Sequence, residues 1–234
     1  MKKAIVILLV SFFSITAKAQ HFGVNFSAGS SWVNKLNPQV TGKVNPKLFY
    51  GFGVFYTKKS ETSSWGFRTG LNFDKRNIGA TYSKEYYDEY EMQQYYIDGT
   101  STTSDNLLAL SSGPTLNISK KLQLALDIHY TYLLSRTGTG SSDTYLDKEK
   151  KILYESNQGS SKANGLSLTD RSSYGANLML TYQVSGRVDL GLTYCYWRQF
   201  KYYVVHFSNY KPFYNALNIT TNIYFKSRKN AVEN

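Results

Sequence analysis

The amino-acid sequence predicts an all-β fold, an eight-stranded antiparallel up-and-down transmembrane β-barrel with short periplasmic turns and long extracellular loops. Three observations predict it: a long alternating segment, connections that alternate between short and long, and an aromatic content of 16%. In the alternating segment, 122–134, every second residue from Leu122 to Leu134 is large and apolar. A strand sends successive side chains to opposite faces, so this segment has one apolar and one more polar face. Even when tilted, it is long enough to cross the hydrocarbon layer of a bilayer.

Seven further segments show the same alternation. In chain order the eight predicted strands are 21–33, 47–58, 65–78, 106–118, 122–134, 172–184, 187–199 and 213–225. The fourth is the weakest, because Pro114 cannot donate to a ladder and predicts a bulge. The short connections are 59–64, 119–121 and 185–186, and the long ones are 34–46, 78–105, 136–171 and 200–212. Short turns at one end and long loops at the other are typical of an outer-membrane barrel with its turns in the periplasm.

Each of these strands has one face of large apolar or aromatic side chains. In chain order, and leaving out 122–134, these faces comprise Phe22, Val24, Phe26, Ala28 and Trp32; Leu48, Tyr50, Phe52, Val54 and Tyr56; Trp65, Phe67, Leu71 and Phe73; Leu108, Leu110, Pro114, Leu116 and Ile118; Tyr174, Ala176, Leu178, Leu180, Tyr182 and Val184; Val188, Leu190, Leu192, Tyr194 and Tyr196; and Leu217, Ile219, Ile223 and Phe225. The opposite faces carry mostly Gly, Ser, Thr and Asn. Small residues of this kind suit the cramped interior of an eight-stranded barrel.

The alternation alone also fits a soluble, lipocalin-like barrel, which has its apolar residues inside. The scarcity of charges on the polar face, the aromatic rings near strand ends and the length of the strands favour the membrane orientation. Four charged side chains then point inward: Arg68, Asp74, Asp127 and Asp189. Because an isolated buried charge is expensive, we expect Arg68 to pair with one or more of the aspartates in an interior ion-pair network that plugs the lumen.

The N-terminus predicts export. Two lysines, an apolar run over 4–13 and Ala-Lys-Ala at 17–19 are typical of a secretory signal peptide, which gives a signal peptide over 1–19 and one barrel domain over 20–234. We expect the cell outer membrane of a Gram-negative bacterium as the location. The net charge of +11, or +8 without the three lysines of the signal peptide, then favours lipid and lipopolysaccharide phosphates and other envelope proteins as partners, and not nucleic acid.

Several motifs together resemble a known group of proteins. They are the Ala-Lys-Ala-Gln cleavage region, the Gly-Val-Asn-Phe-Ser-Ala-Gly opening strand at 23–29, the Leu-x-Leu-x-x-Gly-Pro strand at 108–114, and an ending in Tyr224-Phe225. The chain is similar in these features to the small outer-membrane barrels of Bacteroidetes-type bacteria, the PorT-like group. The resemblance implies that Phe225 helps the assembly machinery recognise the last strand, although nine residues follow it here. PorT itself is linked to a secretion system for surface proteins, but no residue of this chain gives a reason to assign that task to it.

An enzymatic alternative rests on one short motif. A family of outer-membrane lipid-A deacylases uses His-x-Ser on an outward strand, and this chain has His129-Tyr130-Thr131, with Thr in place of the nucleophilic Ser. The alternation places His129 on the inward face, where an interior histidine without a catalytic role is the simpler interpretation. The three histidines lack metal-ligand spacing, so we expect no catalytic residue, metal or cofactor.

The second long loop is the best candidate for a binding surface. It carries Tyr86, Tyr87, Tyr90, Tyr95 and Tyr96. Tyrosine supplies contact area at a low entropic cost. The simpler prediction is that the two flanking strands extend beyond the membrane as a Tyr-rich hairpin. The third long loop, 136–171, is rich in Gly and Ser and is expected to be mobile.

The sequence therefore favours a non-enzymatic barrel with a plugged interior. We expect a role in envelope structure, in surface binding, or as an accessory subunit of a larger outer-membrane complex. The alternatives are a lipid-A-modifying acyl hydrolase and a narrow channel.

Overall fold

A computed structural model describes residues 20–34, 41–59, 63–162, 171–199 and 213–225. The predicted signal peptide lies outside these residues, as do the connections at 35–40 and 200–212. The described residues form nine β-strands: β1 (Gln20–Val33), β2 (Thr41–Lys59), β3 (Trp65–Asp88), β4 (Gln93–Asn117), β5 (Leu122–Tyr145), β6 (Leu153–Lys162), β7 (Ser172–Gln183), β8 (Val188–Gln199) and β9 (Phe213–Tyr224).

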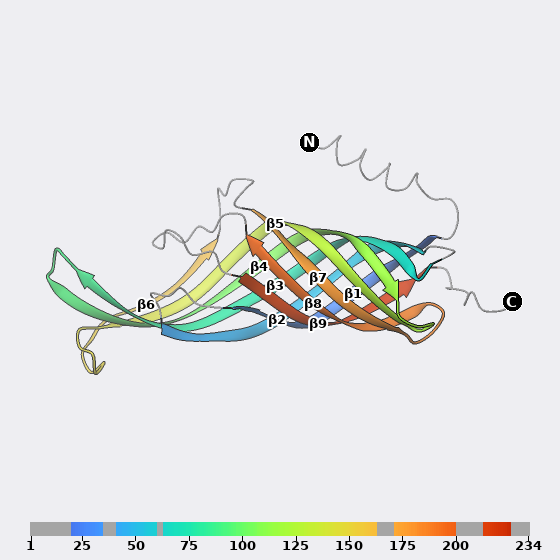
Figure 1. Ribbon diagram of the computed structural model, residues 1–234. Coiled ribbons are helices and arrows are strands. Elements are labelled where there is room, and N and C mark those ends of the chain that lie inside the picture. Colours follow the sequence, from blue (N-terminus) through green and yellow to red (C-terminus); the bar gives the residue numbers. More distant parts are fainter. Residues whose placement is uncertain (1–19, 35–40, 60–62, 163–170, 200–212, 226–234) are drawn as a thin grey trace, which may run out of the picture.

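Eight of these strands form a closed antiparallel ring. Around the ring the order is β1, β2, β3, β4, β5, β7, β8 and β9, and the β1–β9 ladder closes it from Gly23↔Tyr224 to Val33↔Tyr214 (Figure 1). Closure pairs both edges of every strand within the ring, which removes the open edges that an isolated sheet would have. The ring strands are the eight that the alternation predicts, so the up-and-down topology is confirmed for the described residues.

Three strands continue past the ring as a long sheet, which we call the extension. It consists of 77–88 of β3, 93–106 of β4, 136–145 of β5 and all of β6, flanked by the start of β2 at 41–46 (Figure 1). The predicted Tyr-rich hairpin is therefore present as the β3–β4 hairpin. The prediction that 136–171 is a mobile loop is wrong for 136–145, which extends β5, and for 153–162, which forms β6.

The predicted bulge at Pro114 is also wrong. Pro114 pairs with Phe67, and the β3–β4 register is continuous on both sides of it. The register instead shifts between Pro46 and Phe49, between Asn106 and Leu107, and between Thr144 and Tyr145. Two of these shifts lie where the ring gives way to the extension. Because a bulge bends a strand and increases its twist, these positions redirect the strands as they leave the ring.

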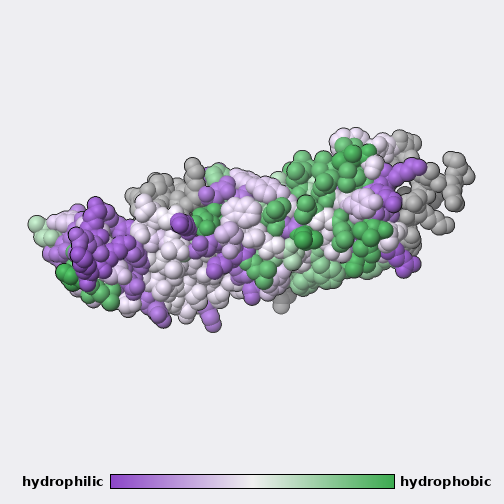
Figure 2. Space-filling model, turned by 90° about the horizontal axis from the view of Figure 1, so that it is seen from below, coloured by the Kyte–Doolittle hydropathy of each residue, from purple (hydrophilic) through white to green (hydrophobic). Residues whose placement is uncertain are grey.

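The two surfaces of the ring differ as the alternation predicts. Exposed apolar side chains cover its outside on every strand, for example Phe52 on β2, Ile128 on β5 and Ile219 on β9. Figure 2 shows these hydrophobic residues gathered on the half of the molecule that the ring forms, whereas most of the extension is hydrophilic. Among the described residues, no helix is long and apolar enough to cross a membrane.

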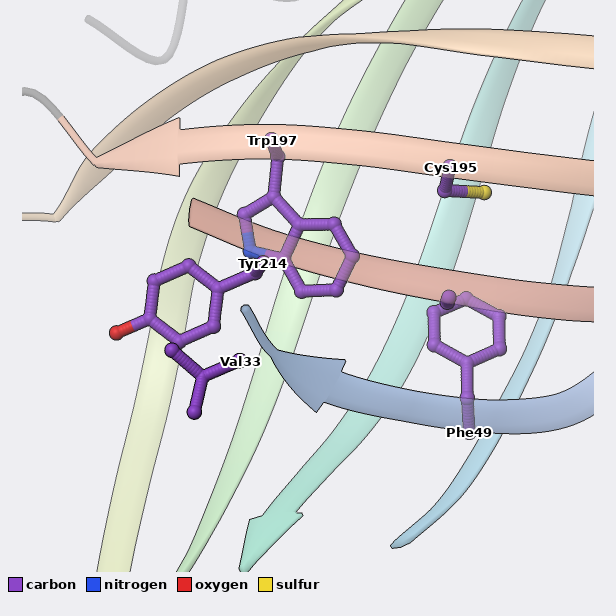
Figure 3. Close-up of a cluster of buried hydrophobic side chains, with 6 residues drawn as sticks. Val33, Phe49, Cys195, Trp197 and Tyr214 are labelled. Atoms are coloured by element: carbon purple, nitrogen blue, oxygen red, sulfur yellow. The ribbon is translucent and has the colours of Figure 1, made fainter. Parts of the chain in front are cut away.

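The inside of the ring is filled with buried side chains. Its outer end, next to the extension, holds an apolar cluster that includes Val33, Phe49, Cys195, Trp197 and Tyr214. Figure 3 shows the indole of Trp197 on β8 next to the ring of Tyr214 on β9, with Val33 of β1 beside them. Buried Ser, Thr, Asn, Asp and Arg side chains occupy the rest of the interior.

Candidate functional site

A first arginine crosses the barrel interior near its outer end. Arg76 projects from β3, and its guanidinium carbon lies 3.9 Å from the ring centroid of Trp197 on β8, the strand diametrically opposite in the ring. Trp197 in turn stacks on Tyr214 at a centroid distance of 5.5 Å and an interplanar angle of 13°. A desolvated cation over an indole is an attractive arrangement. We call Arg76, Trp197 and Tyr214 the outer crossbar.

Carboxylates surround the outer crossbar. The Oδ2 atom of Asp74 lies 3.6 Å from Nη2 of Arg76. Asp105 accepts two hydrogen bonds from Arg136, at 2.6 Å from Nε and 2.7 Å from Nη2. This bidentate geometry is the strongest form of an arginine–carboxylate contact. Two arginines and two aspartates therefore balance each other where the ring opens toward the extension.

A second arginine crosses the interior near the other end of the ring, away from the extension, which we call the inner end. The guanidinium carbon of Arg68 lies 4.3 Å from the ring centroid of Phe55, and its Nη2 donates a hydrogen bond of 3.1 Å to Oδ1 of Asn222 on β9. Phe55 packs against Tyr224 edge to face at 5.1 Å. The Tyr224 hydroxyl donates a hydrogen bond of 2.8 Å to Asp189. We call Arg68, Phe55 and Tyr224 the inner crossbar.

All four charged residues singled out in the sequence lie inside the ring and are buried: Arg68, Asp74, Asp127 and Asp189. Asp74 forms its ion pair with Arg76. The sequence analysis did not single out Arg76. It also missed Asp105 and Arg136. The alternation in β3 could have found Arg76, because it shares the inward parity of Arg68 and Asp74. Ion pairing of Arg68 itself with the aspartates stays a prediction.

His129 lies inside the barrel, as its parity predicts, with 2% of its surface exposed. Thr131 is fully buried beside it on the same face and hydrogen-bonds the hydroxyl of Ser173. Both groups therefore face the inside of the ring and not the exposed outward face of β5. Within the described part of the chain, no three His, Cys, Asp or Glu residues lie together as a metal site would need.

The far end of the extension is formed by two turns with fixed backbones. In the β3–β4 turn, Oδ1 of Asp88 accepts hydrogen bonds from the backbone N–H groups of Tyr90 at 2.9 Å and Glu91 at 3.1 Å, and Met92 has a φ of 53°. In the β5–β6 turn, Asp147 accepts the N–H group of Ile152 at 2.7 Å and that of Lys151 at 2.9 Å. Aspartates that cap turns in this way reduce the freedom of the backbone. The hydrogen bond from Ile152, followed by the others in the turn, holds the pKa of Asp147 below its usual value.

The two turns are joined into one unit, which we call the tip. Tyr95 is 6% exposed, lies 5.2 Å from the ring of Tyr154 on β6, and donates a hydrogen bond to Glu91. That hydrogen bond raises the pKa of Tyr95, because it stabilises the protonated phenol. Lys150 forms an ion pair with Asp98 on β4. Partial burial alone would raise the pKa of Asp98, but the hydrogen bonds from Lys150 and Ser83 outweigh it and lower that pKa.

The tip presents exposed apolar side chains. They are Tyr86, Tyr87, Tyr90, Met92, Ile152, Leu153 and Tyr154. Tyr90 is 99% exposed and Met92 is 75% exposed. Of the five tyrosines singled out in the sequence, Tyr86, Tyr87 and Tyr90 are therefore on the surface, Tyr96 is half-buried, and Tyr95 is buried in the junction of the tip.

The tip is also acidic. Residues 84–98 and 143–155 contain four lysines and nine aspartates or glutamates, a net charge of −5 in a chain whose net charge is +11. The tip therefore combines exposed aromatic side chains with a net negative charge, whereas the chain as a whole is positively charged.

Comparison with known proteins gives matches to solved structures alone, since neither a protein-family model nor a curated protein matches the sequence. Ail of Yersinia pestis, solved in complex with the heparin analogue sucrose octasulfate, is 13% identical, with 88% of this chain and 99% of that chain covered and a TM-score of 0.37. Neisserial surface protein A is 9% identical, with 86% and 96% covered and a TM-score of 0.36. The translocator domain of the autotransporter NalP from Neisseria meningitidis is 9% identical, with 95% and 94% covered and a TM-score of 0.24. These similar structures are outer-membrane β-barrel proteins.

Proposed function

We propose that this protein is a non-enzymatic integral outer-membrane β-barrel that holds a stiff sheet above the membrane and binds a cationic protein surface through its tip. The observation that carries the proposal is the division of the surface: apolar side chains cover the outside of the ring, and a polar sheet with an acidic, aromatic end projects from it. An exposed apolar belt of this size is costly in water and favourable against acyl chains.

The closed interior supports binding over transport or catalysis. Two crossbars of arginine and aromatic side chains traverse the lumen, and eight strands leave room for little more than side chains. The hydrolase alternative loses support because His129 and Thr131 lie inside the ring, away from lipid. No observation in the structure favours it.

The tip has the properties of a preorganised binding surface. Its turns are fixed by Asp88 and Asp147, so little backbone entropy is lost on binding. Its exposed tyrosines give large contact area, and its negative charge selects a basic partner and repels anionic lipid headgroups. Such a partner belongs to the other envelope proteins that the sequence analysis expects as partners, including a subunit of a larger outer-membrane complex.

Membrane insertion is tested by fractionating cells that express the full chain. We expect the mature protein in the outer-membrane fraction, extractable by detergent alone, with a heat-dependent shift in electrophoretic mobility that reports the folded ring. A mature chain that stays monodisperse in buffer without detergent would overturn the membrane proposal.

Tip binding is tested by site-specific photo-crosslinking in the native cells. A crosslinker at Tyr90 should capture a protein with a basic surface, and one at Thr81, which is exposed on β3 closer to the ring, should not. Reversing the tip charge with Glu85→Lys and Glu89→Lys should reduce the yield from Tyr90, whereas Glu85→Asp and Glu89→Asp should preserve it. Equal yields from both positions, or a yield that ignores the charge reversal, would contradict this role.

A further inference from the structure

The space between the two crossbars is a polar chamber. It is lined by side chains from around the ring, among them Asn25 of β1, Asn72 of β3, Asp127 of β5, Asn177 of β7 and Asn218 of β9. The volume open to the centres of water molecules is about 50 Å³. One water needs about 10–15 Å³ on this measure, so the chamber has room for a few.

The chamber walls carry hydrogen-bonding atoms that have no partner among the described residues. They are the Oδ1 atoms of Asn25, Asn72, Asp127, Asn177 and Asn218, atoms Nε and Nη1 of Arg76, and both ring nitrogens of His129. All seven of these residues line the same chamber. Leaving a buried polar group unsatisfied costs about 1–3 kcal/mol. A space that so many unpartnered acceptors and donors face therefore requires a polar occupant.

From this arrangement we infer that the interior of the barrel is a latent, water-filled pore, closed at each end by an arginine–aromatic crossbar. Water fits the chamber better than a fixed ion does. Arg68 and Arg76 line it together with Asp74 and Asp127, so the formal charges cancel, and the unpartnered atoms include both donors and acceptors. A few bridging waters satisfy such a mixed set.

Each crossbar closes the lumen independently, because the two lie at different heights and use different aromatic partners. Arg76 reaches Trp197 at the outer end, and Arg68 contacts Phe55 at the inner end. Removing one arginine therefore leaves the other barrier intact. Removing both joins the chamber to the two sides and removes the two cations that line it, so the negative charges of Asp74 and Asp127 favour cations in the opened pore.

The inference is tested by planar-bilayer recording of purified protein, and it rests on the proposed membrane location. Wild type, Arg68→Ala and Arg76→Ala should be silent, whereas the Arg68→Ala/Arg76→Ala double variant should conduct and prefer K⁺ over Cl⁻. Lys75→Ala, which removes a cation from the outward face of the same strand, is the matched control and should be silent.

A second double variant distinguishes an opened pore from a misfolded protein. Phe55→Ala/Trp197→Ala removes from each crossbar the aromatic ring that its arginine contacts and keeps the charges balanced, so it should conduct with weak ion preference. Double variants that show the heat-dependent mobility shift, enter liposomes and remain silent would overturn the inference, as would an open wild type. If no variant, nor the wild type, enters liposomes, the proposed function fails instead.

Discussion

Arg76 is the residue on which the outer end of the interior depends. It lies 3.6 Å from Asp74 and stacks on Trp197, and it is 3% exposed. Arg76→Met would leave Asp74 buried without its cation, and breaking a buried pair in this way costs about 3 kcal/mol. Urea unfolding in detergent, followed by the mobility shift, measures this loss.

Two variants make the Arg76 measurement specific. Lys75→Met, on the outward face, should change the free energy of unfolding by less than about 0.5 kcal/mol. Asp74→Asn combined with Arg76→Met should recover part of the loss, because the unpaired carboxylate is gone. A single Arg76→Met variant as stable as wild type would contradict the pairing.

Tyr95 gives the tip a spectroscopic signal. Its pKa is raised by the hydrogen bond to Glu91, so its phenol stays protonated above the usual pH range of tyrosine ionisation. A phenol whose folded pKa is raised contributes stability below its unfolded pKa, near 10, and that stability is lost as the pH rises through the folded pKa. The difference in ultraviolet titration between wild type and Tyr95→Phe isolates this group. Glu91→Gln should move the Tyr95 transition to lower pH, and an unmoved transition would show that the hydrogen bond is not the cause.

Among the elements, the eight ring strands could be predicted because each buries one face inside the ring and exposes an apolar face outside it, so that large apolar residues recur with a period of two. The outer part of β5 and the whole of β6 could not be predicted in this way. Residues 137–142 are Gly, Ser and Thr, with no apolar face, and their strand conformation comes from pairing with β4 and β6.

The bulge between Asn106 and Leu107 explains one missed site residue. It reverses the parity of β5, so Arg136 turns inward toward Asp105, although the alternation from Leu122 would place it outside.

Two glycines on different elements should differ strongly in their sensitivity to the same substitution. A Cβ atom on Gly175 of β7 would lie 1.9 Å from the carbonyl oxygen of Tyr196 and 2.7 Å from Nε2 of His129, whereas one on Gly159 of β6 would meet nothing within 4 Å. Gly175→Ala should therefore destabilise the ring by about 1–3 kcal/mol through overpacking. Gly159→Ala should have an effect of less than about 0.5 kcal/mol. Unfolding midpoints of the two variants compare them directly, and equal midpoints would mean that β7 can shift to make room.

At the scale of the whole molecule, the two ends of the barrel should differ in their access to protease. The tip exposes Lys148, Lys150 and Lys151, and the opposite end exposes Lys120 and Lys121 in the β4–β5 turn. Trypsin added to intact cells should cut at the tip lysines and leave the β4–β5 turn whole. Cleavage at Lys120 or Lys121 before the outer membrane is permeabilised would reverse the orientation proposed for the barrel.

The ladder between β1 and β9 has a consequence for how the molecule forms. It joins the first described strand to the last, so the ring cannot close before nearly the whole chain has been synthesised. Contacts between residues so distant in sequence make folding slow, and until β9 arrives both β1 and β8 offer an unpaired edge. A product truncated before Phe213 should therefore aggregate or be degraded and not accumulate as a smaller barrel. If the chain inserts into the outer membrane as proposed, it therefore needs protection from self-association until the ring has closed.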